Sequence, residues 1–591
     1  MSQLHAPESG SKIPTIREAA VFRAKSFGLQ SKRILNDTIG REVSRFQKGN
    51  GLADRPPIAE SKSALWTEIE PEERYLVAGK IQNLRVAIAS LKGLEIPAGE
   101  VFSFWKHVGR TTKLKGYVEG RELREGCIIP NIGGGLCQLS NALYDAALKA
   151  NFEIVERHAH TQTIAGSLAE QGRDATVFWN YVDLRFRSEH AFRIETELTS
   201  DHLLVIFRGT KQELPTLHQI QKTAKIDHVN SCASCGMDDC FRSVKPEKNK
   251  DFGKTAFLVD EFSAEFDSYI QSIRTEKDVL LFPLDGKRFN RANYAWNTAG
   301  FSGVKQFAYI TAIRSIKSRR LAAQGAARQQ NLLATYEQLA ASYAKKLSYD
   351  ALHVVVQQNL LPFLWQTGQL GGRTFDVLMT ALPMAELQKR LDHAFQIHGE
   401  SKTLGDFRAH QDLIEAETAA LKNARRIITT HSAIAALFPE KAGLLAWKMP
   451  SIKAFEKPQN EKPRIVFPAS TVGRKGCYEL REAIRGLDVS LVTLGPNIEG
   501  ADFWQGFDVT RGGDDWLETA DLVVLPAFVE HKPSRLLRAA AAGVPVIASS
   551  TCGVDGVAGV TTIEAGDAYA LRQAIEGALA SKAPIRETVA A

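Results

Sequence analysis

The sequence of 591 residues lacks any long hydrophobic run. No stretch approaches the roughly 18 consecutive apolar residues that a membrane-spanning helix requires. The longest apolar runs, such as DLVVLPAFV at 521–529, have the length of strands. The first twenty residues also lack a basic segment followed by an apolar one, so we predict no secretory signal and a cytoplasmic location.

Concentrated basic charge is absent as well. The chain has 74 Lys and Arg against 67 Asp and Glu, and its net charge of +7 is a small excess for this length. No basic run is interleaved with aromatic residues, which argues against nucleic acid as a partner. Seven cysteines, an odd number in a chain without a predicted export signal, favour thiols or metal ligands over disulfides.

Strand and helix patterns divide this multidomain chain into five segments. We expect a polar N-terminal arm (1–62), an α+β domain (63–210), a cysteine-containing connector (211–253) and two α/β halves (254–455 and 456–591). In the last segment, buried-strand runs such as PRIVFPAS and ADLVVLP alternate with helical stretches. That alternation is typical of a doubly wound parallel sheet.

Three glycines precede a cysteine in IGGGLCQLS, residues 132–140, where a helix is predicted to begin. On that helix Cys137, Asn141 and Tyr144 fall opposite an apolar face, so we expect the cysteine to lie outside the core. A helix N-terminus lowers the pKa of a thiol. The glycines would let an oxyanion approach backbone N–H donors; they are Gly133, Gly134 and Gly135.

A thiol nucleophile requires a base and a group that orients the base. His160 in ERHAH and Asp174 in GRDATVFW follow Cys137 in the order of transglutaminase-like thiol enzymes. The alternative is structural, with Cys137 packed beside a glycine turn and the histidine satisfied by hydrogen bonds. Both interpretations stay open from the sequence.

These motifs resemble the VanW family. Four of them occur in order, namely IPAGEVFSFWKHVGRTTKLKGY, IGGGLCQLSNALYDAAL, ERHAHT and GRDATVFWNYVDLRF, and the resemblance covers about residues 80–210. The resemblance implies a cell-envelope context without naming a reaction.

The connector contains DHVNSCASCGMDDCF. A C-x-x-C pair followed by glycine is the knuckle that directs two thiolates at one metal. We predict a structural zinc site with an iron–sulfur cluster as the alternative; its ligands are Cys232, Cys235, Cys240 and His228, with Asp239 or a distant cysteine as a substitute for the histidine. A reduced cysteine cluster without metal is the structural alternative.

The last two segments, about 254–591, resemble GT-B glycosyltransferases that retain anomeric configuration. The resemblance is carried by GRKGCYELREAI and by ADLVVLPAFVEHKPSRLLRAAAAGVPVIASSTCGV. It implies that Arg474 and Lys475 bind the donor diphosphate, that Gly473 and Gly476 close the loop over it, and that Glu530 faces the donor sugar. An ordinary solvated loop is the structural alternative.

One position departs from the family pattern. A second glutamate is expected eight residues after Glu530, where this chain has Arg538. An arginine only donates hydrogen bonds and cannot accept them from ribose hydroxyls. Either the donor is held differently or this half has lost transferase activity.

The first functional hypothesis is a glycosyltransferase that uses a nucleotide sugar and a glycan or lipid-linked envelope or capsule precursor as acceptor. The helix AYITAIRSIKSRRLAAQ would suit peripheral contact with the inner membrane, although packing between domains is the preferred interpretation.

The second hypothesis makes Cys137, His160 and Asp174 a thiol enzyme for amides or esters, beside a degenerate GT-B half that only binds a sugar nucleotide. The third is a non-enzymatic, metal-stapled scaffold.

Overall fold

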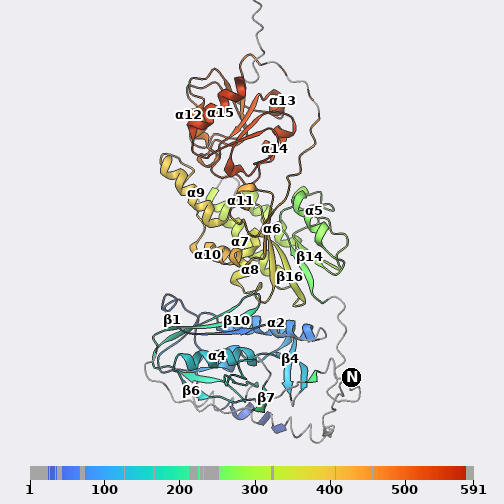
Figure 1. Cartoon of the computed structure of the whole chain (residues 1–591), viewed down its shortest axis with the longest axis vertical. Helices are drawn as coiled ribbons and strands as arrows, with labels where there is room; N and C mark the ends of the chain where they lie inside the picture. The colour runs from blue at the N-terminus through green and yellow to red at the C-terminus, as the bar shows by residue number, and fades with distance from the viewer. Residues whose placement is uncertain are drawn as a thin grey trace, which may run out of the picture. The chain divides into compact units, whose positions relative to one another are not determined.

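The computed structural model forms two compact units, one built mainly from residues up to 254 and the other mainly from residues 255 onward (Figure 1). The structure describes residues 43–66, 73–124, 127–160, 167–179, 181–211, 252–320, 325–405, 408–453 and 460–580, with a few single residues and short pieces outside these ranges.

The first unit is built on antiparallel strands. Its largest sheet has the order β1-β10-β9-β2, and a second sheet has the order β3-β8-β6. β1 pairs along its length with β10, so the boundary predicted at residue 62 falls inside a strand of the domain. The strands of these two sheets are β1 (Pro57–Ala64), β2 (Leu94–Ile96), β3 (Val101–Ser103), β6 (Glu153–Glu156), β8 (Arg185–Arg187), β9 (Phe192–Leu198) and β10 (His202–Gly209).

Short pairings complete this unit. They are β4 (Glu119–Arg124) with β5 (Cys127–Ile132) and β12 (Asn230–Ser231), and β7 (Gln162–Thr163) with β11 (Ala224–Lys225). The helices are α2 (Arg74–Leu91), α3 (Phe104–Val108) and α4 (Cys137–Lys149), with the 3-10 turn η2 (Lys113–Lys115).

The helix α4 packs against β1 and β10, and α2 packs against β4 and β9 (Figure 1). The apolar face predicted for α4 lies in the core, where Leu139 and Leu143 are fully buried. The opposite face is covered too, because Asn141 and Tyr144 are also buried. The segment around 174–177 lies over this face, and Cys137, expected outside the core, is partly buried and packs against it.

The second unit contains two doubly wound sheets, as predicted. The first has the strand order β15-β14-β13-β16-β17-β18-β19. Its strands are β13 (Lys254–Leu258), β14 (Val279–Phe282), β15 (Gly303–Gln306), β16 (Ala351–Gln357), β17 (Thr374–Met379), β18 (Arg426–Thr429) and β19 (Ala442–Leu444). Its helical segments are α5 (Ala264–Ile273), η3 (Ala292–Tyr294), α6 (Ala308–Arg320), α7 (Gly325–Ala344), η4 (Gln358–Leu360), α8 (Leu361–Gln366), α9 (Met384–Ile397), α10 (Gln411–Asn423) and α11 (Ser432–Ala436).

The helix α6 begins the segment for which membrane contact was considered. Its Arg314 is buried and donates two hydrogen bonds, of 2.7 and 2.8 Å, to the carboxylate of Asp260. Asp260 follows β13 directly and also accepts a bond from Asn359 at 2.6 Å. This pairing ties one face of α6 to the first sheet of the second unit, while packing between domains and contact with a membrane both stay predictions.

The second sheet has the order β22-β21-β20-β23-β24-β25 with parallel neighbours. Strands such as β23 are buried at every position, because a parallel sheet is covered on both faces. Its elements are β20 (Arg464–Phe467), η5 (Gly473–Lys475), α12 (Cys477–Ala483), β21 (Ser490–Thr493), β22 (Val509–Arg511), α13 (Trp516–Thr519), β23 (Leu522–Leu525), α14 (Ser534–Ala541), β24 (Val546–Ser549), η6 (Ser550–Cys552), β25 (Val560–Ile563) and α15 (Ala568–Ala580).

Candidate functional sites

The glycine turn that leads into α4 is held by its own chain. Gly133 and Gly135 have φ angles of +81° and +94°, a region that favours glycine. A Cβ at Gly134 would lie 2.4 Å from the carbonyl oxygen of Gly120. The N–H groups of Gly133 and Gly134 donate to the carbonyls of Val118 and Asn131 at 3.1 and 2.9 Å. These two amides are thus engaged within the protein, and for Gly135 the oxyanion role stays a prediction.

The structure brings the three predicted thiol-site residues together. The Nδ1 atom of His160 donates to Oδ1 of Asp174 at 2.5 Å, and the backbone N–H of His160 donates to Oδ2 of the same carboxylate at 2.6 Å. The side chain of Asp174 is 1% exposed and that of His160 is 21% exposed. Cys137 is partly buried at the first position of α4. Cys137 and His160 are therefore both partly exposed, while the carboxylate of Asp174 is buried.

The electrostatics of the site favour a charged pair. Burial alone would raise the pKa of Cys137, but the hydrogen bond and positive charge of His160, with smaller help from Val177 and Thr176, bring it below the ordinary thiol value. Burial would lower the pKa of His160, but hydrogen bonds to Asp174 and Cys137 raise it above the ordinary value. Both shifts favour a thiolate on Cys137 beside an imidazolium on His160.

Neighbours of the site were not found from the sequence. Thr176 places its Oγ1 atom 3.7 Å from Sγ of Cys137. Asn141 accepts the backbone N–H of Ala175 at 2.7 Å, which fixes the segment that carries Asp174 and Thr176 on α4. His158 is half exposed and contacts Glu156 at 3.2 Å instead. Spacing along the chain gave no signal for Thr176, because its role depends on how this segment crosses the helix.

The predicted metal knuckle lies outside the described residues. This applies to all four ligands, Cys232, Cys235, Cys240 and His228, and to Asp239. Within the described ranges, no group of three or more His, Cys, Asp or Glu side chains could hold a metal ion.

The predicted donor-binding residues lie at a reversal of strand order. Counted in chain order, the strands of the second sheet run 3-2-1-4-5-6, and ligands bind such sheets outside the carboxyl ends of the strands at the reversal. η5 follows β20 and Glu530 follows β23, the two strands that flank this point. Lys475 Nζ lies 2.9 Å from Oε2 of Glu530, and the carbonyl of Arg474 accepts the N–H of Phe528 at 3.0 Å.

The loop around η5 is tightly constrained. Gly476 has a φ of +76°, and a Cβ there would lie 2.0 Å from the carbonyl oxygen of Pro526. The N–H of Gly473 donates to Oε1 of Glu499 at 2.6 Å. Glu499 also accepts hydrogen bonds from the hydroxyls of Thr403 and Tyr478 at 2.5 and 3.0 Å. Sequence reasoning missed this buried carboxylate, which joins the loop to the first half of the unit.

The loop of Glu530 is also held by the first half of the unit. Nε2 of His431 donates to the carbonyl of Glu530 at 2.9 Å. The N–H of Leu382 donates to Nε2 of His531 at 3.4 Å, and Lys532 forms an ion pair with Glu261. Both His431 and Glu261 are polar residues just beyond the carboxyl end of a strand, a signal that could have identified them.

Positive charge accumulates around this loop. Burial is the main reason that the pKa of His531 falls to about 3, and the charges of Lys475, His431, Arg474 and Arg390 lower it further. Arg390 on α9 pairs through Nε with Glu386 at 2.7 Å. Its buried NH1 atom has no hydrogen-bond partner among the described residues. Arg474, Lys475 and Arg390 therefore place positive charge near His531, and two of these cations are paired with the carboxylates of Glu530 and Glu386.

Arg538 contacts a different group. Its guanidinium lies over the ring of Trp516, with Cζ 5.7 Å from the ring centroid. The structure thus gives Arg538 a cation–π contact between α14 and α13 and shows no pairing with Glu530.

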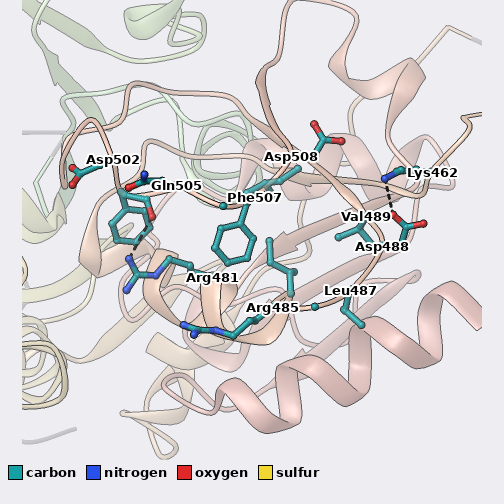
Figure 2. A pocket seen from close by; sticks show the side chains of 15 residues that line it. Lys462, Arg481, Arg485, Leu487, Asp488, Val489, Asp502, Gln505, Phe507 and Asp508 are labelled. Carbon is teal, nitrogen blue, oxygen red and sulfur yellow. Dashed lines mark hydrogen bonds and ion pairs between the residues drawn. The ribbon is translucent and has the colours of Figure 1, made fainter.

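A pocket of about 770 Å³ lies elsewhere in this half (Figure 2). It is lined by Lys462 and Val489, which precede β20 and β21, and therefore lies at the amino edge of the sheet. Lys462 pairs with Asp488 at 2.7 Å, and Arg481 lies against Phe503 with Cζ 4.4 Å from the ring centroid. Parallel sheets bind ligands at the opposite edge, so this pocket is not the donor site.

Fold and site together define a chain with an α+β domain that carries a Cys-His-Asp arrangement, followed by a GT-B-type pair of doubly wound sheets. Residues 79–207 match the family model for VanW like protein. Residues 463–581 match the model for Glycosyl transferases group 1. The chain thus carries a VanW-like domain fused to a GT-B-type region whose last domain is that of a group 1 glycosyltransferase, as the sequence motifs predicted.

Two curated relatives match the first domain. The uncharacterized protein YoaR of Bacillus subtilis (strain 168) is 33% identical over 108 residues, which are 18% of this chain and 35% of the relative. The vancomycin B-type resistance protein VanW of Enterococcus faecalis (strain ATCC 700802 / V583) is 30% identical over 152 residues, 25% of this chain and 55% of the relative. The matches therefore span about a third and about half of these relatives.

Solved structures match the second unit at low scores. Sucrose-phosphate synthase from Thermosynechococcus elongatus has a TM-score of 0.35 and 16% identity, and the match covers 55% of this chain and 90% of that one. The lipopolysaccharide outer core galactosyltransferase WaaB has a TM-score of 0.33 and 15% identity, with coverage of 56% and 91%. The fold of the second unit is therefore defined by the strand orders of its two sheets.

None of the helices in the described part of the chain has both the length and the apolar character needed to cross a membrane.

Proposed function

We propose that this protein transfers a sugar from a nucleotide-sugar donor to a hydroxyl of a cell-envelope or capsule precursor. The observation that carries the proposal is the Lys475–Glu530 pair, which lies at the strand-order reversal of the domain that matches group 1 glycosyltransferases. The companion domain supports the envelope context, because a relative of it is a vancomycin resistance protein. The acceptor is then a glycan or a lipid-linked precursor, reached in the cytoplasm or at the inner membrane surface.

The cations of the site suit the charge that develops in such a transfer. The bond between the anomeric carbon and the diphosphate oxygen breaks, and negative charge grows on the leaving diphosphate. Arg474, Lys475 and Arg390 would bind that charge, with Lys475 exchanging its carboxylate partner for phosphate. Glu530, held through its carbonyl by His431, would then face the donor sugar.

Isothermal titration with UDP-, GDP- and ADP-sugars tests the proposal. We expect one nucleotide class to bind and the variant Lys475→Gln to weaken its binding about tenfold, the loss of one charge-assisted contact. Lys462→Gln is the matched control, because Lys462 pairs with an aspartate at the opposite edge of the same sheet. Absence of binding by every donor would refute the transferase, and with it the scaffold in which the GT-B half binds a nucleotide sugar as a signal.

The metal in the connector remains a separate proposal. Cys232, Cys235, Cys240 and His228 fit a structural zinc site by their spacing, and an iron–sulfur cluster is the alternative. Metal analysis of the purified protein together with its ultraviolet–visible spectrum tests this directly. Stoichiometric zinc without visible absorbance supports the first assignment, brown colour supports the second, and absence of metal refutes both.

A further inference from the structure

We propose that the VanW-like domain has a catalytic activity of its own, the cleavage of an amide or ester through a thioester on Cys137. This inference is independent of the transferase proposal, because it uses only residues of the first unit.

The arrangement of exposure and contacts carries the inference. Cys137 and His160 are partly exposed and interact with each other, whereas Asp174 is buried and accepts hydrogen bonds from both Nδ1 and the backbone N–H of His160. With Nδ1 committed to the carboxylate, Nε2 is the ring nitrogen that remains for the thiol. A base oriented by a third group is the general signature of an activated nucleophile.

Two other free cysteines provide an internal contrast. Cys477 and Cys552 are fully buried, and burial raises the pKa of Cys552 to about 12 and that of Cys477 beyond the range in which a thiolate forms. Among these three thiols only Cys137 is partly exposed and has an imidazole neighbour. Cys477 and Cys552 therefore have the environment of structural cysteines, and Cys137 does not.

The chemical step can be written with its atoms balanced. The Cys137 thiolate attacks the carbonyl carbon, a C–S bond forms, and the bond from that carbon to the leaving nitrogen or oxygen breaks. The imidazolium of His160 gives its proton to the leaving amine or alcohol. Water then attacks the thioester while His160 takes a proton from it, which releases a carboxylic acid and restores the thiol.

Among the described residues, charged side chains near the pair contact other groups. Arg157 donates from Nε to the backbone carbonyl of Asp174 at 2.6 Å, and the stem of Lys80 on α2 packs against Gly135. Glu156 contacts the exposed His158 at 3.2 Å. The reactivity of Cys137 at neutral pH is therefore expected to depend chiefly on His160.

Alkylation by iodoacetamide across pH 5 to 9, with each cysteine peptide quantified by mass spectrometry, tests the inference on the whole chain. We expect Cys137 to react at pH 6 to 7, well below the pKa of about 8.5 of a free thiol. His160→Gln should move the midpoint up toward that value. The matched control is His158→Gln, an exposed histidine two residues away, which should leave the profile unchanged.

The second readout is the acyl enzyme itself. After incubation with p-nitrophenyl acetate and an acid quench, the Cys137 peptide should carry an acetyl group that hydroxylamine removes. The variant Cys137→Ser should show no such hydroxylamine-sensitive acetyl group. A wild-type midpoint near that of a free thiol, or no acetylation of Cys137, would overturn the inference. The wild-type profile decides this even if a variant fails to fold. Failure here leaves donor binding by the second unit untouched, so the two proposals fail separately.

Discussion

The two candidate sites balance charge in opposite ways. In the VanW-like domain the thiol, the imidazole and the buried carboxylate satisfy one another within about forty residues of sequence, through the pairs Cys137–His160 and His160–Asp174. In the second unit, groups from two sheets converge near His531, where Lys475 and Arg390 are paired with carboxylates but NH1 of Arg390 is buried without a partner among the described residues. The first site satisfies its charges with its own residues, and we expect the second to do so with a bound anion.

This difference separates what each site should show without substrate. When the charges of a site are paired with one another, as at Cys137 and His160, the reactivity of the thiol itself changes. A small alkylating reagent can measure that change. A site that satisfies its charges only with a bound anion leaves a measurable excess of positive charge that a phosphate compensates. Variants in the first site should therefore change a rate in the absence of substrate, whereas variants in the second should change affinity or turnover.

The largest effect is expected at Glu530. Glu530→Gln removes the charge that faces the donor sugar and frees Lys475, so kcat/KM for transfer should fall about a hundredfold, as for loss of a preorganised electrostatic contact. Donor affinity should change little. Lys475 would bind phosphate without first breaking an ion pair, and this gain offsets the lost contact between Glu530 and the donor sugar. Steady-state transfer and isothermal titration give the two values, and equal loss of both would show that Glu530 only binds.

The next effect is expected at Asp174, on the other side of the comparison. The carboxylate of Asp174 orients His160 and raises the pKa of its imidazole. Asp174→Asn removes this negative charge, so the pKa of His160 should fall and fewer imidazolium–thiolate pairs should form. Because the pKa of Cys137 then moves up toward its ordinary value, its alkylation rate at pH 6.5 should fall at least tenfold, while at pH 9 it should change little. A uniform loss at both pH values would indicate altered access.

A tenfold effect is expected at Arg390. Its NH1 atom is buried without a partner, and its charge reaches both His431 and His531 beside the Glu530 loop. Arg390→Gln should weaken a nucleoside diphosphate about tenfold, the worth of one charge-assisted hydrogen bond. A nucleoside monophosphate should lose less. Arg408→Gln is the control, because Arg408 pairs with the exposed Asp392; unchanged diphosphate binding in Arg390→Gln would remove Arg390 from the site.

The sequence predicted those parts of the fold that repeat a local pattern. Buried-strand runs such as LVVL identified the doubly wound sheets, and Cys137, His160 and Asp174 were identified because each lies in a distinct short motif. Burial of Asn141 could not be predicted, because a helical wheel shows the faces of one helix and not the segment that crosses it. Arg390 and Glu499 were not predicted from the sequence. Their contacts form where the two sheets of the second unit meet, and a periodic pattern within one helix or strand carries no information about such contacts.

The smallest effect is expected at Arg538, where the family pattern has a glutamate. Its guanidinium lies over Trp516, so the arginine is committed to a contact between α13 and α14. Arg538→Glu should cost that cation–π contact, about 0.5 to 1 kcal/mol at an exposed site. It should change donor affinity less than twofold if the other cations hold the diphosphate. Titration of both Arg538→Glu and Arg538→Gln with the donor separates the effect of the new negative charge from the effect of removing the arginine. A rise in donor affinity of tenfold or more in Arg538→Glu alone would show that this position contacts the ribose and that the arginine weakens the donor site.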